Sequence, residues 1–405
     1  MSNNAQKLES LSLEERRKLL QRNEPPQPSK TCTKLEQRMY FLQDLHPRSN
    51  AYTLYPCFEI KGPLDIKQLK HSINQLVLRH PNLRCSFQKS GPHLRKVIHE
   101  QAHVNIQHHQ PPKGPEQDLQ INALLIKEIQ KPFNLSKGPL LRVHLIQKDP
   151  NTHQLLIHIH HIISDGWSIH LMIKEISALY NQHPLAPLKQ AQASNPKSNI
   201  EFWKSHLKNP APPVTFPLQH NRPKQHHTQG AELIGQVPKQ LRAKIQSWCD
   251  QKKVTPFLFY LLIFQTLLAK YTQKTDLILG HPIANRNNTQ DLNCIGLFSN
   301  TVALRQQLNQ DSRLDALLQD TKPLLFSALQ AQSTPFDDII QAINPQRNPN
   351  ENPLFLIMFN FQNEPSYSLN LDKLQCQAIQ APIAHALVDL TLDIWDQEDT
   401  YRLQW

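Results

Sequence analysis

Two hydrophobic periods divide the first half of the chain into helices and strands. Between residues 65 and 80, apolar side chains from Ile66 to Leu76 recur at spacings of three and four, which predicts a helix with one buried stripe. Residues 140–147 and 154–163 are apolar or alternating on either side of a short turn sequence, and this pattern predicts two paired strands. Further elements are expected as helices at 35–45, 117–130 and 168–180 and as strands at 52–60, 83–88, 93–98 and 104–108.

The second half contains a similar mixture of helices and strands after a polar interruption. Residues 182–227 are rich in Pro, Gln, Asn and His, which is typical of an extended connection. Thr255 before Pro256 is the pattern of an N-cap followed by a first-turn proline, so an apolar helix is expected to run from there to about residue 270. The remaining expected elements are strands at 276–280, 296–304, 354–361 and 387–395 and a helix at 313–331.

The domain organisation that follows from these patterns has four parts. An N-terminal leader, residues 1–31, contains a capping-box pair at Ser12 and Glu15 before a short amphipathic stretch and a Pro-rich spacer. This leader is either a linker or docking helix for an upstream protein or a frayed terminal helix, and the sequence leaves both open. The other parts are an N-terminal α/β lobe at 32–185, an inter-lobe crossing at 186–230 and a C-terminal α/β lobe at 231–405.

Composition narrows the class of protein. The chain has 405 residues, of which 39% are hydrophobic, so it can bury a sizeable core and is not wholly disordered. Its net charge of +11 favours an acidic partner, which can be nucleic acid, an anionic membrane or an acidic protein. The six cysteines form no closely spaced pair, no secretory signal opens the chain, and the most apolar stretch is too short to span a bilayer. We therefore expect a soluble, cytoplasmic protein with reduced thiols.

The most distinctive polar segment is HHIISDG at residues 160–166, where a predicted strand ends and a helix begins. Strand alternation places His160 and His161 on opposite faces, so that one can enter the core while the other faces a cleft as a general base. Asp165 can hold the turn, and Gly166 lets a thin ligand or another backbone pass close by. On the pattern alone, a polar strand end with a buried histidine remains the alternative. A metal site is not expected, because adjacent strand residues diverge and no outlying ligand is evident.

Several other segments accompany this motif along the chain. In the first lobe they are KLEQRMYFL at 34–42, RHPNLR at 79–84 and PFNLSKGPLLR at 132–142, and in the second they are GHPIANR at 280–286, IGLFSNTVALR at 295–305 and NPLFLIMFNFQN at 352–363. Together with the HHxxxDG motif, they resemble the condensation domains of nonribosomal peptide synthetases and their chloramphenicol-acetyltransferase-like relatives. The resemblance covers residues 34–405.

This resemblance implies an α/β fold of two chloramphenicol-acetyltransferase-like lobes, arranged as a V-shaped pseudo-dimer around a central tunnel. Phosphopantetheine arms of a donor and an acceptor carrier protein would enter from opposite faces, and the acceptor amine would attack the donor thioester to form an amide. His161 would take the catalytic role, orienting the nucleophile or accepting its proton, while His160 would be structural. Asp165 and Arg286 would form a buried ion pair that shapes the catalytic loop, and Gly166 would leave clearance for the arm.

Four further residues are expected from the resemblance to line the tunnel. They are Trp167, Ser168, His281 and Asn300. Asn300 has an equally good alternative as a cap at the end of a strand. His281 departs from the family, which has a small or hydroxyl residue there, and it is expected to narrow or re-polarise the acceptor side.

Partners and reaction follow from the same resemblance. We expect donor and acceptor peptidyl carrier proteins, an adjoining adenylation domain, no permanently bound cofactor, no nucleic acid and no membrane, in a monomer that serves antibiotic or secondary-metabolite synthesis. The chain ends at Trp405, short of the family's usual length, so a truncated C-terminal lobe is expected. Two alternatives stay open: an HHxxxDG acyltransferase that uses a free amine, a free alcohol or coenzyme A, and a noncatalytic domain that recruits other proteins.

Overall fold

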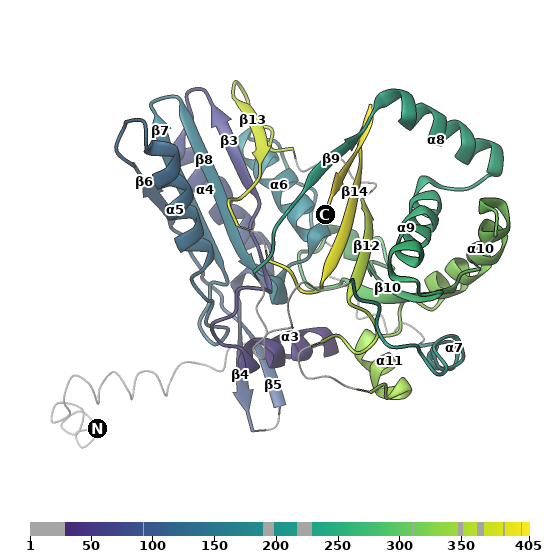
Figure 1. Cartoon of the computed structure of the whole chain (residues 1–405). Coiled ribbons are helices and arrows are strands. Elements are labelled where there is room, and N and C mark those ends of the chain that lie inside the picture. Colours follow the sequence, from purple (N-terminus) through teal and green to yellow (C-terminus); the bar gives the residue numbers. More distant parts are fainter. Residues whose placement is uncertain are drawn as a thin grey trace, which may run out of the picture.

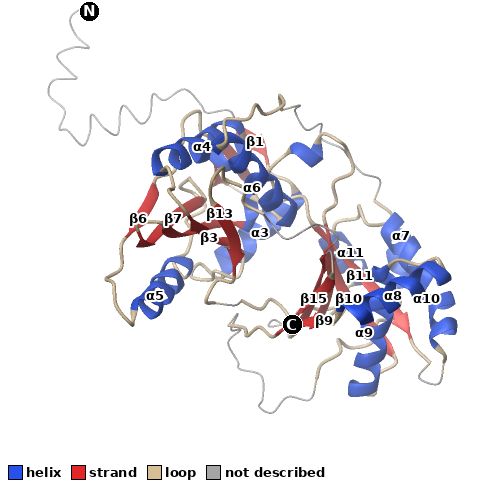
Figure 2. Ribbon diagram, turned by 90° about the horizontal axis from the view of Figure 1, so that it is seen from above, coloured by secondary structure: helices blue, strands red, loops and turns tan. Residues whose placement is uncertain are grey.

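In the computed structural model, two α/β lobes lie side by side (Figure 1, Figure 2). The structure describes residues 29–91, 93–188, 198–216, 229–309, 312–346, 351–362, 368–383, 385–397 and 399–405. Each lobe contains a six-stranded sheet, and the N-terminal lobe has an additional three-stranded sheet. This arrangement agrees with the expected two-lobed α/β fold.

The main sheet of the N-terminal lobe lies between two helical layers. Its strands are β2 (Thr53–Leu54), β3 (Cys57–Lys61), β6 (Ile106–His109), β7 (Leu141–Asp149), β8 (Thr152–His160) and β13 (Gln375–Ile379), in the order β13-β3-β8-β7-β6 with β2 also on β8. Helices α4 (Ile66–Arg79) and α6 (Gly166–Tyr180) lie on one face and α5 (Gln117–Ile129) on the other (Figure 2). Neighbouring residues therefore enter different cores, since Leu145 packs in the cluster of α4 and α6 while Ile146 packs with α5.

A second, three-stranded sheet extends this lobe. β5 (His93–Ile98) pairs antiparallel with β4 (Cys85–Ser90) on one side and with β1 (Ser29–Thr31) on the other. The three residues of β1 belong to this sheet although the sequence assigned them to the leader, because their backbone completes the edge of β5. The helix expected after Ser12 lies outside the described residues.

The C-terminal lobe is one sheet with its long helices on a single face (Figure 1). The strands are β9 (Ile234–Val237), β10 (Asp276–Ile283), β11 (Asn300–Gln307), β12 (Ile357–Gln362), β14 (Leu390–Gln397) and β15 (Thr400–Gln404), in the order β11-β10-β12-β14-β15-β9. The helices are α7 (Ile200–His206), α8 (Lys239–Lys252), α9 (Pro256–Thr272), α10 (Leu314–Gln330) and α11 (Phe336–Ile343). Phe264, Phe359 and Tyr401 fill the core between the sheet and α9. Thr255 caps α9 as predicted, accepting a hydrogen bond from the backbone N–H of Leu258.

Contacts between α3 (Lys34–Leu45) and α11 join the two lobes at one end. Lys34 Nζ lies 2.8 Å from Asp338 Oδ2, and Arg38 Nε lies 3.3 Å from Asp337 Oδ1. Elsewhere β13 pairs antiparallel with β3, so a segment that the sequence placed in the C-terminal lobe completes the N-terminal sheet. The division at 231–405 is therefore corrected for this strand, whose sequence QCQAI alternates glutamine with only small apolar side chains and does not indicate which sheet it joins.

Two predicted strands differ from the structure for reasons that the backbone explains. The strand expected at 52–60 is split into β2 and β3 around Pro56, which has no N–H to give to the ladder. The strand expected at 296–304 begins only at Asn300, because the N–H groups of Gly296, Phe298 and Ser299 bond to side chains at the start of α6 instead.

The length and apolar composition of the helices bear on whether one of them could cross a membrane. No single helix among the described residues is long and apolar enough to cross a bilayer, although α8 and α9 together meet that length and composition with a bend of 105° between them. No disulfide joins the six cysteines, all of which lie in the described ranges.

Candidate active site at the junction of the two lobes

Residues 160–166 connect the end of β8 to the start of α6. A short 3-10 turn, η2 (His161–Ile163), follows the strand, and Asp165 is the N-cap of α6. The two isoleucines of the turn are at most 1% exposed and pack into the N-terminal core. The two isoleucines therefore anchor the turn in the core. His161, at the start of the turn, is half-buried, and Gly166, at the start of α6, is exposed.

His160 is fully buried beneath this turn. Its Nδ1 accepts a hydrogen bond from the backbone N–H of Ile162, so the ring proton is on Nε2, which lies 3.1 Å from Gln43 Oε1. Burial lowers the pKa of His160 to about 3, and the Coulomb effect of His161 acts in the same direction. A neutral, doubly bonded ring of this kind suits the structural role that the sequence predicts.

His161 is the first residue of the same turn and is half-buried. Its backbone N–H donates to the carbonyl of Tyr52 at 2.9 Å, which fixes the first residue of the turn. The Nδ1 atom is buried, whereas the side chain as a whole is half-buried, so the accessible part of the ring includes Nε2. Burial lowers the pKa of His161, opposed by the charge of Asp165 and by backbone groups of His161 and Ser164. The imidazole is therefore neutral near pH 7 and can accept a proton or a hydrogen bond.

Asp165 and Arg286 form a buried ion pair between the lobes. Arg286 Nη2 lies 2.8 Å from Asp165 Oδ1, and each side chain is 1% exposed. Asp165 Oδ2 accepts hydrogen bonds from the backbone N–H groups of Phe298 at 3.0 Å and Ser299 at 3.2 Å. Asp165 Oδ1 also accepts from the backbone N–H of Ser168 at 2.8 Å. The carboxylate is enclosed by donors, which suits a structural role better than proton transfer.

The guanidinium of Arg286 fixes the C-terminal side of this contact. Its Nη1 donates to the carbonyl of Asp291 and, at 2.7 Å, to that of Cys294. The group also lies over the ring of Phe298, with 4.2 Å between Cζ and the ring centre. Arg286 thus holds together the loop that supplies the backbone donors to Asp165.

Ser168 belongs to the same network and does not line an open surface. It is fully buried, and its Oγ lies 2.7 Å from Asp165 Oδ1. The hydroxyl oxygen accepts from Arg286 Nη2 at 2.9 Å and from the backbone N–H of Gly296 at 3.0 Å. The tunnel position predicted for Ser168 is therefore corrected to a support of the inter-lobe contact.

Trp167 and Gly166 lie at the accessible edge of the junction. Trp167 is half-buried, and its Nε1 donates to the carbonyl of Leu292 in the other lobe at 2.9 Å. Its ring also contacts Arg286, with 5.9 Å between Cζ and the ring centre. Gly166 is exposed at the first position of α6. The structure thus brings these two residues together with His161, Asp165 and Arg286.

Asn300, which was also predicted to line the tunnel, is 5% exposed and forms hydrogen bonds within its own lobe. Its Nδ2 donates to the carbonyls of Gln332 at 2.9 Å and Thr334 at 2.8 Å. Its Oδ1 accepts from the backbone N–H of Phe336, the first residue of α11, at 3.1 Å. These bonds match the alternative of a strand-end cap, and the tunnel assignment is corrected accordingly.

His281 lies on the helical side of the C-terminal sheet and is 8% exposed. Its Nδ1 is 2.9 Å from the carbonyl oxygen of Phe359, and its ring packs against Phe257 of α9. Burial lowers the pKa of His281 to about 4. The residue fills the core of its lobe, so the effect on the acceptor side that the sequence predicts has no support from its position.

Two supporting residues were missed because each acts through a long-range bond. Gln43 presents its Oε1 to His160 since its Nε2 is held by the carbonyls of residues 46, 47 and 49. Asn82 Nδ2 donates to the carbonyl of Ile295 at 2.6 Å, and Ile295 itself is buried in the N-terminal core. Both amides lie inside or beside segments that the sequence marks as motifs, but spacing along the chain does not show which distant backbone they reach.

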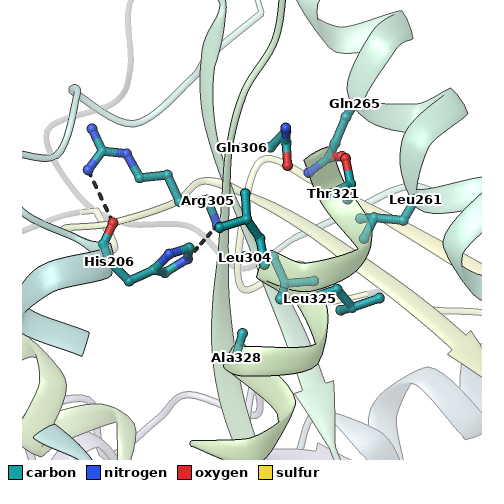
Figure 3. A pocket seen from close by; sticks show the side chains of 10 residues that line it. His206, Leu261, Gln265, Leu304, Arg305, Gln306, Thr321, Leu325 and Ala328 are labelled. Carbon is teal, nitrogen blue, oxygen red and sulfur yellow. Dashed lines mark hydrogen bonds between the residues drawn. The ribbon is translucent and has the colours of Figure 1, made fainter. Parts of the chain in front are cut away.

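A recess on the outer side of the C-terminal lobe is separate from this junction (Figure 3). It is lined by residues of α9, α10 and the edge strand β11, and by His206 of α7. His206 Nε2 accepts from the backbone N–H of Arg305 at 3.4 Å, and burial lowers the pKa of His206 to about 4. Arg305 in turn pairs with Asp276 at 2.7 Å. None of the predicted site residues lines this recess.

Among the residues that the structure describes, no group of three or more His, Cys, Asp or Glu side chains is arranged to hold a metal ion.

Comparison with known proteins identifies the family. A model described as the condensation domain matches residues 30–404. Surfactin synthase subunit 2 of Bacillus subtilis (strain 168) is 29% identical over 379 residues, which cover 91% of this chain but only 10% of that protein. The chain thus spans about a tenth of the length of this curated relative.

Solved structures give the same fold at low sequence identity. Holo-AB3403, a four-domain nonribosomal peptide synthetase bound to AMP and glycine, superposes with a TM-score of 0.82 at 20% identity, covering 93% of this chain and 31% of that one. The X-domain from teicoplanin biosynthesis superposes with a TM-score of 0.81 at 18% identity, covering 94% and 90% respectively. With nearly the whole chain matched by the family model, this protein belongs to the condensation domain family.

Proposed function

We propose that this chain catalyses peptide-bond formation in nonribosomal peptide synthesis, joining a carrier-bound acyl or aminoacyl thioester to a carrier-bound amine. The position of His161 carries the proposal. The residue is half-buried at the junction of the lobes, is held neutral by burial, and lies four residues before Asp165, which pairs with Arg286. Membership of the condensation domain family supports the same class of reaction.

His161 acts at the attacking amine. Its Nε2 accepts a hydrogen bond from the acceptor amine and directs the nitrogen lone pair toward the thioester carbon. A bond forms between nitrogen and that carbon, the carbon–sulfur bond breaks, and the proton lost by nitrogen ends on the departing thiolate. His161 either transfers this proton or only holds the amine in line, and a neutral imidazole suits both.

The neighbouring residues position this histidine and do not touch the reacting atoms. Asp165 caps α6 and binds the opposite loop, so His161 is fixed between two rigid elements. Gly166 is exposed and has no side chain, which leaves room for a phosphopantetheine arm to pass. Trp167, bonded to Leu292, flanks that approach.

The proposed partners are donor and acceptor peptidyl carrier proteins, each delivering its substrate on a phosphopantetheine arm. The net charge of +11 favours transient docking of acidic partners of this kind. Activation of the amino acids is proposed to come from adenylation domains, and the setting from antibiotic or secondary-metabolite synthesis in the cytoplasm. The great length of surfactin synthase subunit 2 relative to this chain fits such a division of labour.

Reconstitution with separately purified carriers tests this function. One carrier is loaded with a donor aminoacyl group and the other with an acceptor amino acid, and mass spectrometry of the intact carriers follows the dipeptide. The proposal predicts a dipeptidyl acceptor that forms only when both carriers are loaded, with an unloaded acceptor carrier as the control. Equal transfer to a free amine or from coenzyme A would favour the broader acyltransferase. Carrier binding without any transfer would favour a recruitment domain.

A further inference from the structure

The C-terminal sheet carries polar side chains on the face that its helices leave uncovered. Along β12, Phe359 enters the core under α9, so the next residue, Asn360, points to the opposite face. Along β14, Ile394 enters the same core and Asp393 points away from it. This opposite face is turned away from α8, α9 and α10 and toward the N-terminal lobe (Figure 1).

The strand register aligns these polar residues across the sheet. Asn360 of β12 is opposite Asp393 of β14, and Asp393 is opposite Gln404 of β15. In the next row, Trp395 is opposite Arg402. A sheet face packed against a second apolar layer would alternate with apolar side chains here. This row of amide, carboxylate and guanidinium groups instead suits contact with water or a polar ligand.

The carboxylate of Asp393 has few hydrogen-bond partners. Asn360 Nδ2 donates to its Oδ1 at 2.8 Å, and no second hydrogen bond reaches the carboxylate from the described residues. The side chain is only half-buried, yet burial raises its pKa to about 6, with the charge of Glu232 adding to the effect and Asn360 and Arg402 opposing it. Partial burial at this position therefore disfavours the charged carboxylate unless a further donor or a cation joins it.

The nearby cation does not neutralise this carboxylate by direct pairing. Arg402 donates to Gln404 Oε1 at 3.1 Å, and its Cζ lies 4.8 Å above the ring of Trp395. No ion pair joins Arg402 to Asp393 among the described residues. Asp393 therefore keeps an oxygen that can accept a hydrogen bond from a ligand.

We propose that Asp393, oriented by Asn360, is a specificity-determining residue that binds a protonated amino group of the aminoacyl substrate. This inference rests on the proposed function and names a feature of its substrate. An ammonium group would give the free oxygen of Asp393 a charge-assisted hydrogen bond. A purely apolar acyl group would leave this half-buried carboxylate without a cationic partner, which is unfavourable when the group also shields it from water.

Binding of three stable substrate mimics tests the inference without requiring turnover. Pentanoyl, norvalyl and ornithinyl amides of aminopantetheine carry no amine, an α-amine, and both an α-amine and a side-chain amine, respectively. We expect the chain to bind at least one amine-bearing mimic about tenfold or more tightly than the pentanoyl amide, as measured by calorimetry. The comparison of norvalyl with ornithinyl amides shows which amine is bound.

Two variants and one titration complete the test. Asp393→Asn keeps the shape but removes the charge, and it should lose the preference for the amine. Asp396→Asn is the matched control, because Asp396 on the same strand pairs with Arg242 of α8 at 2.8 Å, and it should keep the preference. In the unaltered chain, the preference should weaken as the pH falls through about 6, where Asp393 protonates.

The outcomes separate this inference from the proposed function. An unaltered chain without amine preference, or Asp393→Asn with the preference of the unaltered chain, overturns the role of Asp393 even if dipeptide forms normally. An amine preference that depends on Asp393 in a chain that forms no dipeptide supports the binding site and contradicts the proposed condensation.

Discussion

Asp165 and Arg286 are 2.8 Å apart where the start of α6 meets residues 285–299 of the other lobe, and both side chains are 1% exposed. The contact is made by charged groups, but its surroundings are backbone donors and acceptors that leave little room for water. The pair therefore couples the integrity of the lobe junction to the position of His161, which lies four residues before Asp165.

Asp165→Ala should lower the free energy of unfolding by about 3–5 kcal/mol, because Arg286 and three backbone N–H groups lose their buried partner. Urea unfolding at neutral pH measures this loss, and condensation should fall with it. The double variant Asp165→Ala/Arg286→Ala should cost less than the sum of the two single changes. A stable Asp165→Ala protein without activity would instead indicate a direct chemical role.

Asn300→Ala should lower the free energy of unfolding by about 1–3 kcal/mol. Its side chain satisfies two carbonyls and the backbone N–H of Phe336 at the start of α11, and alanine leaves these groups without a partner. Thermal unfolding measures the loss, while the KM for loaded carriers should stay unchanged. Unaltered stability with a changed KM would restore the tunnel assignment for Asn300.

Acid should destabilise the protein through its buried histidines. Burial lowers the pKa values of His158 and His160 to about 3 and of His144 and His281 to about 4. The unfolded chain, with histidine pKa values near 6.5, binds more protons below that pH, so the free energy of unfolding should fall as pH decreases from about 6.5 toward 4.

Urea unfolding across this range gives the slope, to which each histidine contributes at most about 1.4 kcal/mol per pH unit. His158→Phe, which cannot take up a proton, should reduce the slope. A free energy of unfolding that is constant between about pH 6.5 and 4.5 would contradict the burial of these rings in neutral form.

Gly280→Ala should destabilise the C-terminal lobe by about 1–3 kcal/mol, because the added methyl would overlap the ring of the buried Phe355. Gly235→Ala is the control, since a methyl at that position meets nothing within 4 Å. Comparison of the two melting temperatures checks the prediction, and equal values would show that Phe355 moves aside without cost.

Elements with a strong local signal were predicted well from the sequence. The helix of residues 65–80 and the helix after Thr255 follow from apolar spacing and capping groups, and the structure contains both. β13 was missed because its alternation of glutamine with small apolar residues is short and weak, and because its partner strand β3 lies more than 300 positions away. Long-range pairing of this kind is invisible to local periodicity.

The same distinction applies to the site. The ion pair of Asp165 and Arg286 was expected from motif resemblance, and the structure places the two charges in contact. Ser168 and Asn300 were expected on a tunnel wall but turn inward, since their polar atoms bond to backbone groups of distant segments. A motif shows which residue types recur together and does not show which way each side chain turns.

The rate of dipeptide formation by His161→Ala tests the central claim most directly. Loaded donor and acceptor carriers are mixed with each protein, and the dipeptidyl carrier is followed by mass spectrometry under single-turnover conditions. The account predicts a rate lower by about 10²–10⁴-fold, with unchanged urea unfolding and unchanged carrier binding, because the change removes the group proposed to act at the attacking amine, while the buried Nδ1 of the ring has no hydrogen-bond partner among the described residues to lose. A rate within about twofold of the unaltered chain would contradict the assignment of His161 as the catalytic residue.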